Sequence, residues 1–326
     1  MSFPQVRTIV LLGALVAVGC SHPAATGRSL LPAPSLGAPG APGTSREELD
    51  STVREMEARL ASTPSDRAAA LRLADALLRQ ARVAGHAAPA VKAERVVRTL
   101  LARRDDAQPA VLYRYQAQRL LAAALASQHK FEEAIREAER CLQMQPADAA
   151  AYGIIGDSRL ELGDRAGAFA AFDRMVAMRP DAASYARVAY ARELSGDLPG
   201  AIRLMSMALE ATSPSDVEAL AWHRAQLGAL LLASGQRGRA AREFDHAIHL
   251  FPRYPLAVEG QARVAHNNGD HLAALKLLDQ LDSGAPTSAS LTLAADVLRA
   301  LGRAGEASKK LALAEAVRLT ERPALK

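Results

Sequence analysis

Apolar side chains recur along the chain at the spacing of one face of an α-helix. The first clear stripe has intervals of four, three and four residues and consists of Leu49, Val53, Met56 and Leu60. Such a stripe is typical of an amphipathic helix. Ser45-Arg46-Glu47-Glu48 precedes it with the pattern of a capping box, and Ser62-Thr63-Pro64 follows it as a stop. We therefore expect the folded part to begin at Ser45, with a first helix that ends near Ser62.

Beyond this helix the pattern repeats itself. Glycines occur at intervals of 33, 39, 34 and 33 residues, at Gly163, Gly196, Gly235, Gly269 and Gly302. An alanine follows each glycine after five residues, and one more lies 34 residues before the first of them: Ala134, Ala168, Ala201, Ala240, Ala274 and Ala307. A period near 34 with two helices in each unit predicts a stacked array of helix pairs. Alanine at these places would let paired helices nest closely.

The clearest unit, residues 149–182, resembles the tetratricopeptide repeat. The resemblance rests on Tyr152, Ile155, Gly156, Gly163, Ala168, Phe172 and Pro180. It implies an all-α fold, a right-handed α-solenoid of tetratricopeptide-type helix pairs. We expect Gly156 and Ala168 to mark the close crossing of the two helices, Gly163 to take a left-handed turn, and Phe172 to pack between neighbouring units.

Three departures from the repeat carry their own predictions. His129 stands where the unit around Ala134 should have its turn glycine. Residues 84–89 lengthen the inner turn of the unit that spans residues 65–108. The interval of 39 follows Ser213-Pro214, where Ser215 to Glu218 has the pattern of a capping box. We therefore predict a long helix over residues 216–233.

The N-terminus has the features of an export signal. Arg7 precedes an apolar run from Ile9 to Val18, which is too short to span a bilayer. Its end, Ala17-Val18-Gly19-Cys20, resembles a bacterial lipobox. This resemblance implies that residues 1–19 are removed and that Cys20 carries lipid. Since Ser21 follows rather than Asp, it also implies the outer membrane. The alternative is an ordinary cleaved signal with an incidental cysteine.

Residues 20–44 hold five prolines and four glycines without a helical or strand period. They are predicted to be a disordered tether between the lipid and the repeat domain, which we place at residues 45–326. The formal net charge is +5, but basic and acidic residues are interspersed and form no basic stripe, so nucleic-acid binding is not expected. Cys141, the second of two cysteines, is expected to be an inert core residue.

No arrangement of residues predicts catalysis. The sequence has neither His-Glu-x-x-His nor Gly-x-Ser-x-Gly, and its glycines are spread one to a repeat rather than gathered in a phosphate loop. Glu243, His246 and His249 share one helical face, which would suit zinc or an ordinary solvated surface. With no fourth ligand evident, we predict no metal, no cofactor and no enzymatic activity.

The resemblance implies a concave groove lined by the first helix of each pair. Counted from the repeat phase, the groove-facing residues are Arg119, Asp157, Glu161, Tyr190, Glu193, Trp222, Arg263, His266, Asn267 and Arg299. The alternative for Trp222 is packing against a neighbouring repeat. The best-known groove of the family clamps a C-terminal carboxylate with Lys and Asn, but the matching positions here hold Arg119 and Ala123.

These features predict a membrane-anchored scaffold or assembly factor in the bacterial cell envelope. Its partner would be another protein or peptide in the groove, and its lipid would hold it to the outer membrane, facing the periplasm. The alternative is a lipoprotein that binds peptidoglycan or regulates a cell-wall enzyme. An enzyme is the third hypothesis, and it has no residues in its favour.

Overall fold

The computed structural model describes residues 46–84, 87–103, 108–282 and 286–321. Every regular element in these ranges is an α-helix, as predicted. In chain order they are α1 (Arg46–Ser62), α2 (Arg67–Ala84), α3 (Ala88–Leu101), α4 (Gln108–Ala126), α5 (Phe131–Met144), α6 (Ala149–Glu161), α7 (Arg165–Met178), α8 (Ala182–Leu194), α9 (Leu198–Glu210), α10 (Val217–Ala233), α11 (Arg237–Leu250), α12 (Pro255–Asn267), α13 (His271–Asp282), α14 (Ser288–Ala300) and α15 (Ala304–Glu321). The expected signal peptide, tether and Ser45 cap lie outside the described residues.

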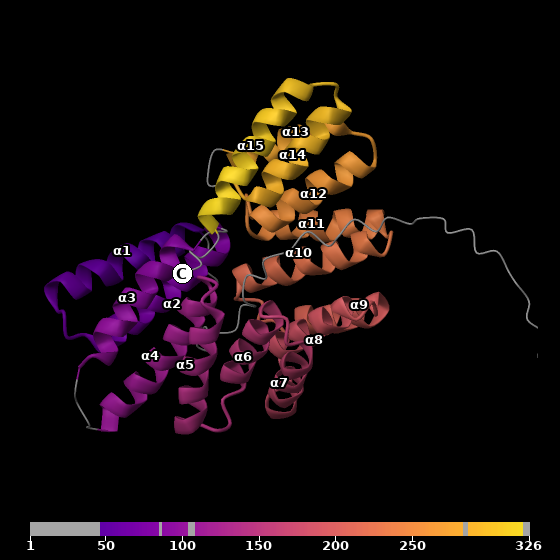
Figure 1. Cartoon of the computed structure of the whole chain (residues 1–326). Helices are drawn as coiled ribbons and strands as arrows, with labels where there is room; N and C mark the ends of the chain where they lie inside the picture. The colour runs from indigo at the N-terminus through magenta and orange to yellow at the C-terminus, as the bar shows by residue number, and fades with distance from the viewer. Residues whose placement is uncertain (1–45, 85–86, 104–107, 283–285, 322–326) are drawn as a thin grey trace, which may run out of the picture. The chain divides into compact units, whose positions relative to one another are not determined.

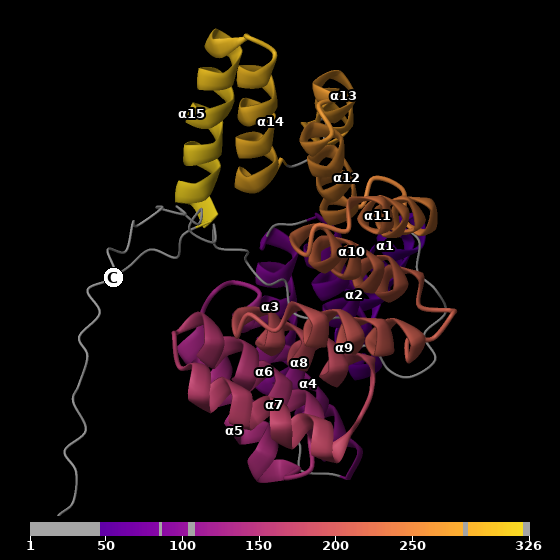
Figure 2. The same cartoon turned by 90° about the vertical axis from the view of Figure 1, so that its right-hand side faces the viewer.

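The helices pack as successive pairs, which makes the fold an α-solenoid. The pairs are α2–α3, α4–α5, α6–α7, α8–α9, α10–α11, α12–α13 and α14–α15. The first helices of several neighbouring pairs also touch one another, as α2 touches α4 and α10 touches α12. Figure 1 and Figure 2 show the pairs following one another in chain order. The first helices therefore form two runs of touching neighbours, one from α2 to α8 and one from α10 to α14.

The turns inside the pairs use the predicted glycines. Gly163, Gly196, Gly235, Gly269 and Gly302 all have positive φ, between 74° and 86°. Glycine reaches this region without the steric cost that a Cβ brings. His129, which stands at the same place in the α4–α5 turn, has φ of 59°. The expectation that His129 replaces a turn glycine is confirmed.

The six alanines in phase occupy equivalent buried positions near the start of the second helices. All of Ala134, Ala168, Ala201, Ala240, Ala274 and Ala307 are between 0% and 1% exposed. Gly156, on the facing first helix, lies so close to the ring of Phe172 that an added methyl group would overlap it. Small side chains thus permit the tight nesting that the period predicted.

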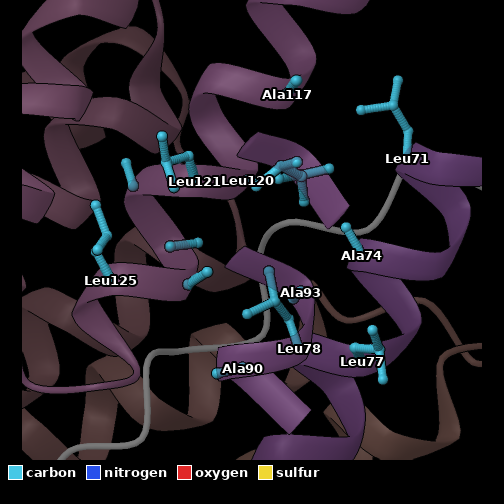
Figure 3. Close-up of a cluster of buried hydrophobic side chains, with 14 of the residues drawn as sticks. Leu71, Ala74, Leu77, Leu78, Ala90, Ala93, Ala117, Leu120, Leu121 and Leu125 are labelled. Carbon is cyan, nitrogen blue, oxygen red and sulfur yellow. The ribbon is translucent and has the colours of Figure 1, made fainter. Parts of the chain in front are cut away.

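The remaining core consists of aliphatic side chains between pairs. Figure 3 shows the largest cluster where α2, α3 and α4 meet, with Leu71, Leu78, Ala93 and Leu121 directed into a common interior. α2 is buried on nearly all of its faces, including Arg79 and Arg82. An amphipathic helix in a two-layer stack keeps one face in water. The burial of α2 therefore requires a further element packed against it.

The long helix predicted over residues 216–233 is α10, Val217–Ala233. Its N-cap differs from the expectation. The Asp216 side chain, not Ser215, accepts a hydrogen bond from the Ala219 N–H. The Ser215 hydroxyl instead pairs with the hydroxyl of Ser213 at 2.8 Å. Asp is as good an N-cap as Ser, and here it lies one residue closer to the helix.

Candidate protein-binding surface

The ten residues predicted to face a groove all lie on first helices. Three of them are exposed, namely Glu161 on α6, Asn267 on α12 and Arg299 on α14. Six are partly buried, namely Arg119, Asp157, Tyr190, Glu193, Arg263 and His266, and Trp222 is buried. The ten positions therefore differ in how accessible they are to a partner.

The end formed by α12 and α14 carries charged side chains that are loosely held. Arg263 pairs with Glu259 at 2.7 Å, and its side chain is 44% exposed. Arg299 pairs with Asp296 at 2.8 Å, and its side chain is 53% exposed. The Arg299–Asp296 pair is exposed on both sides, and such pairs contribute only about 0–1 kcal/mol to stability, whereas the Glu259 side chain is only 15% exposed. The groups of another polypeptide can therefore replace the Arg299–Asp296 pairing at little cost.

His266 meets His271 across the α12–α13 turn. Their Nδ1 atoms lie 3.0 Å apart, so one nitrogen donates a proton and the other accepts it. Partial burial lowers the pKa of His266, and the neighbouring His271 lowers it further. Two imidazoles alone do not make a metal site. The part of the chain that the structure describes holds no group of three or more His, Cys, Asp or Glu side chains arranged to hold a metal ion.

In the middle of the stack, Asp157 on α6 forms an ion pair with a residue of the next repeat. Arg187 on α8 donates to Asp157 Oδ2 from Nε at 3.0 Å and from Nη2 at 2.8 Å. The guanidinium is only 4% exposed. Burial raises the pKa of Asp157, and Arg187 opposes that effect. The Asp157 carboxylate therefore joins two adjacent repeats, and its place in a groove stays a prediction.

Arg119 lies over the ring of Tyr115, with 5.8 Å between its guanidinium carbon and the ring centroid. The Tyr115 hydroxyl donates to Asp148 at 2.7 Å, across to the next repeat. Cys141 on α5 is fully buried, and burial raises the pKa of its thiol to about 12. A thiol that rarely ionises is a poor nucleophile and a poor metal ligand. The expectation of an inert core cysteine is confirmed.

Trp222 does not reach solvent. It is 4% exposed and packs edge-on against His223, with 5.0 Å between ring centroids. It belongs to a buried cluster that also includes Val83 from α2 and Leu49 from α1. Trp222 is therefore not accessible to a partner in this arrangement, and its cluster includes Ala186 and Ala189 on α8 of the neighbouring repeat. The same cluster also includes residues from α1 and α2, at the start of the chain.

Sequence reasoning missed the charged residues that accompany this burial. Arg82 on α2 donates to Glu218 on α10 at 2.9 and 3.3 Å, and both side chains are buried. Burial alone would raise the pKa of Glu218, but the Arg82 guanidinium lowers it below its ordinary value. Arg79 and Arg82 interrupt the apolar residues of α2 in the sequence, which indicates that this helix has a charged partner. The partner's position, 136 residues away, was not readable from the pattern.

Of the three residues considered as zinc ligands, Glu243 and His246 both contact Arg224. Glu243 accepts from Arg224 at 2.8 Å, and Arg224 also approaches His246 Nδ1 at 3.3 Å. His249 lies exposed on α11. Among the described helices, none combines the length and apolar character needed to cross a bilayer.

The repeats match a family model described as tetratricopeptide repeat, over residues 119–183, 155–217 and 226–289. Together these segments cover half of the chain. A segment of 58 residues is 40% identical to the Hsp70-Hsp90 organizing protein of Triticum aestivum and covers 18% of this chain. The chain spans only 10% of the length of that relative.

Solved structures share the architecture at low sequence identity. The APC/C hetero-tetramer Cut9–Hcn1 matches 84% of this chain and 51% of its own with a TM-score of 0.64 at 16% identity, so the chain spans about half of that protein. PilW, a type IV pilus biogenesis factor, matches 62% of this chain and 92% of its own (TM-score 0.52, 19% identity). A tetratricopeptide repeat protein from Parabacteroides merdae matches 82% of this chain and 93% of its own (TM-score 0.51, 16% identity).

Family model and architecture agree with the repeat phase, the turn glycines and the buried alanines. Tetratricopeptide repeats are protein-interaction scaffolds that bind other proteins or peptides in a groove. The chain belongs to the tetratricopeptide repeat family.

Proposed function

We propose that this protein is a lipid-anchored scaffold or assembly factor in the bacterial cell envelope. It holds another polypeptide against the first helices of the pairs, at the end formed by α12 and α14. The observation that carries this proposal is the exposure of Asn267 and Arg299 on these helices, beside the partly exposed Arg263, with an Arg299–Asp296 ion pair that water already weakens. Arginine is among the residues that most often dominate protein interfaces.

The proposed location rests on the N-terminal sequence. Ala17-Val18-Gly19-Cys20 has the pattern of a lipobox, and a Pro- and Gly-rich stretch separates it from the first helix. More than one acyl chain on a single residue would anchor a protein stably. The likeness of the fold to PilW, a pilus biogenesis factor, is compatible with a role in assembling an envelope machine.

The binding surface can be tested by cross-linking in cells that express the full-length protein. A photoreactive phenylalanine derivative placed at Asn267 is expected to yield a discrete cross-linked product with another polypeptide. The matched control is Lys276, which is exposed on α13, the second helix of the same pair. Equal products from both positions, or none from Asn267, would contradict the proposed surface.

The anchor can be tested separately by fractionation. We expect Cys20→Ala to move the protein from the membrane fraction to the soluble fraction, because no acyl chain can then be attached. Cys141→Ala is the matched control, since that thiol is buried in the repeats and should leave the protein on the membrane. Membrane association that survives Cys20→Ala would refute the lipid anchor and leave the cross-linking result unaffected.

A further inference from the structure

Two first helices that are not neighbours in the stack are joined by buried charges. Arg82 on α2 and Glu218 on α10 lie 2.9 Å apart, with side chains 6% and 0% exposed. Arg79, one turn earlier on α2, lies 3.6 Å from Asp216, the cap of α10. In Figure 1 and Figure 2 alike, α2 lies beside α10. Three helix pairs separate these two helices along the chain.

Apolar groups extend the contact to α1 and to the connection between α11 and α12. The guanidinium of Arg46 on α1 lies over the ring of Phe251, 5.7 Å from its centroid. Leu49 from α1 and Val83 from α2 belong to the same buried cluster as Trp222 and Phe251. Tyr254, the residue before α12, places its hydroxyl 3.5 Å from Glu218. The contact thus has an ionic centre with apolar surroundings.

This contact lies on the binding side of the stack. α2 and α10 are both first helices, and first helices line the inner surface of such an array. α2 and α10 belong to different runs of touching first helices, so we infer that their contact crosses the inner surface between these runs. The burial of Trp222 agrees with this, because Glu218 and Trp222 are four residues apart and share one face of α10.

We propose that α1 and α2 are a built-in occupant of the inner surface formed by α10–α12, so that another polypeptide reaches this section only after the contact has opened. This proposal rests on the function proposed above, in which the inner surface binds polypeptide. The inner surface then has two sections. The section on the first helices α12 and α14 is open at rest, and the section on the first helices α10 and α12 is closed at rest.

The contact between α2 and α10 adds little to the stability of the closed state, so it can open. In a repeat array, stability comes from each unit and its nearest neighbours, so the stack does not depend on a contact between distant units. The desolvation of a buried ion pair largely offsets its attraction, so the closed state gains little from Arg82 and Glu218 as a pair. Removing one partner, by contrast, leaves a buried charge alone and favours opening.

Trp222 provides the test, because it is the only tryptophan and lies in the same buried cluster as Leu49 and Val83 of the contact. We expect Glu218→Gln in the full chain to increase acrylamide quenching of its fluorescence by about twofold or more and to shift its emission to the red, while the helical circular dichroism is retained. The matched control is Asp157→Asn, which breaks a buried pair between the neighbouring helices α6 and α8 and should leave quenching unchanged.

A second variant keeps the test decisive if Glu218→Gln disturbs folding. Replacing both charges, as Arg82→Met with Glu218→Leu, keeps apolar groups in the contact, and Trp222 should remain as protected as in the wild type. The proposal is overturned if Trp222 in folded Glu218→Gln stays as protected as in the wild type, if Asp157→Asn exposes it equally, or if the double replacement exposes it. The readout needs no partner, so failure here is distinct from failure of the cross-linking experiment.

Discussion

Replacing Phe172 with alanine is expected to lower the free energy of unfolding by about 3–5 kcal/mol, the usual cost of deleting a fully buried aromatic ring. Phe172 is 1% exposed and packs in one cluster with Ala168 and with Ala191 of the next repeat. It therefore ties together three successive helices, α6, α7 and α8. Urea denaturation followed by circular dichroism measures the loss, and Phe169→Ala, half-buried on the same helix, should cost clearly less.

Gly156 provides an independent check on the same crossing. A methyl group at this position would overlap the ring of Phe172, so Gly156→Ala should itself cost about 1–3 kcal/mol through overpacking. In the Phe172→Ala background the ring is gone and the added methyl has room. The double variant should therefore lose less stability than the sum of the two single variants. Strict additivity would mean that the two residues do not meet as the structure places them.

The repeat architecture was predictable because its requirements are local. A turn that needs positive φ selects glycine at Gly163 and its equivalents, and a close crossing selects a small side chain at Ala168 and its equivalents. These demands recur with each unit and leave a visible period in a single sequence. His129 shows that the position in the repeat predicts the turn conformation even where the residue is not glycine, because its φ is 59°.

The binding surface was less predictable because its accessibility depends on non-local contacts. The phase placed Asp157 and Trp222 on first helices correctly, but it carried no information about what covers them. Arg187 lies one repeat beyond Asp157, so that pairing was within reach of the same phase argument. Arg82 and Glu218 are 136 residues apart in different repeats, and no local rule brings them together. For this reason the phase did not reveal that Trp222 is buried.

Acidification is expected to destabilise the protein through His223 on α10. This ring is fully buried, and burial lowers its pKa to about 4. Thr212 donates its hydroxyl proton to the Ala208 carbonyl, so Nδ1 of His223 is the donor in its 3.0 Å contact with Thr212. The neutral ring therefore carries its proton on Nδ1. The carboxylate of Glu218 on α10 and that of Asp181 at the start of α8 both raise the pKa of His223. Their effect is smaller than the lowering that burial causes.

The direction of the effect follows from the two states. In the unfolded chain His223 takes up a proton near pH 6.5, whereas in the folded protein it does so only near pH 4. Between these values the unfolded state binds more protons, so stability falls as the pH is lowered from 6.5 to 4 and is unaffected by this group above 6.5. The full difference of about 2.5 pKa units corresponds to roughly 3 kcal/mol. Burial raises the pKa of Asp75 and of Asp157, so these two groups stabilise the folded state as the pH is lowered, which opposes the effect of His223. The contribution of His223 to the pH dependence of stability must therefore be isolated by substitution.

His223→Asn isolates the contribution, because an asparagine amide can still donate to Thr212 but does not titrate. Urea denaturation at pH 7.5, 6.5, 5.5 and 4.5 should show the wild type losing stability relative to this variant on every step below pH 6.5. His249→Asn, on the exposed face of α11, should follow the wild type at each pH. A constant difference between wild type and His223→Asn across this range would mean that His223 titrates alike in both states. The ring would then be solvated rather than enclosed at the junction of α9 and α10.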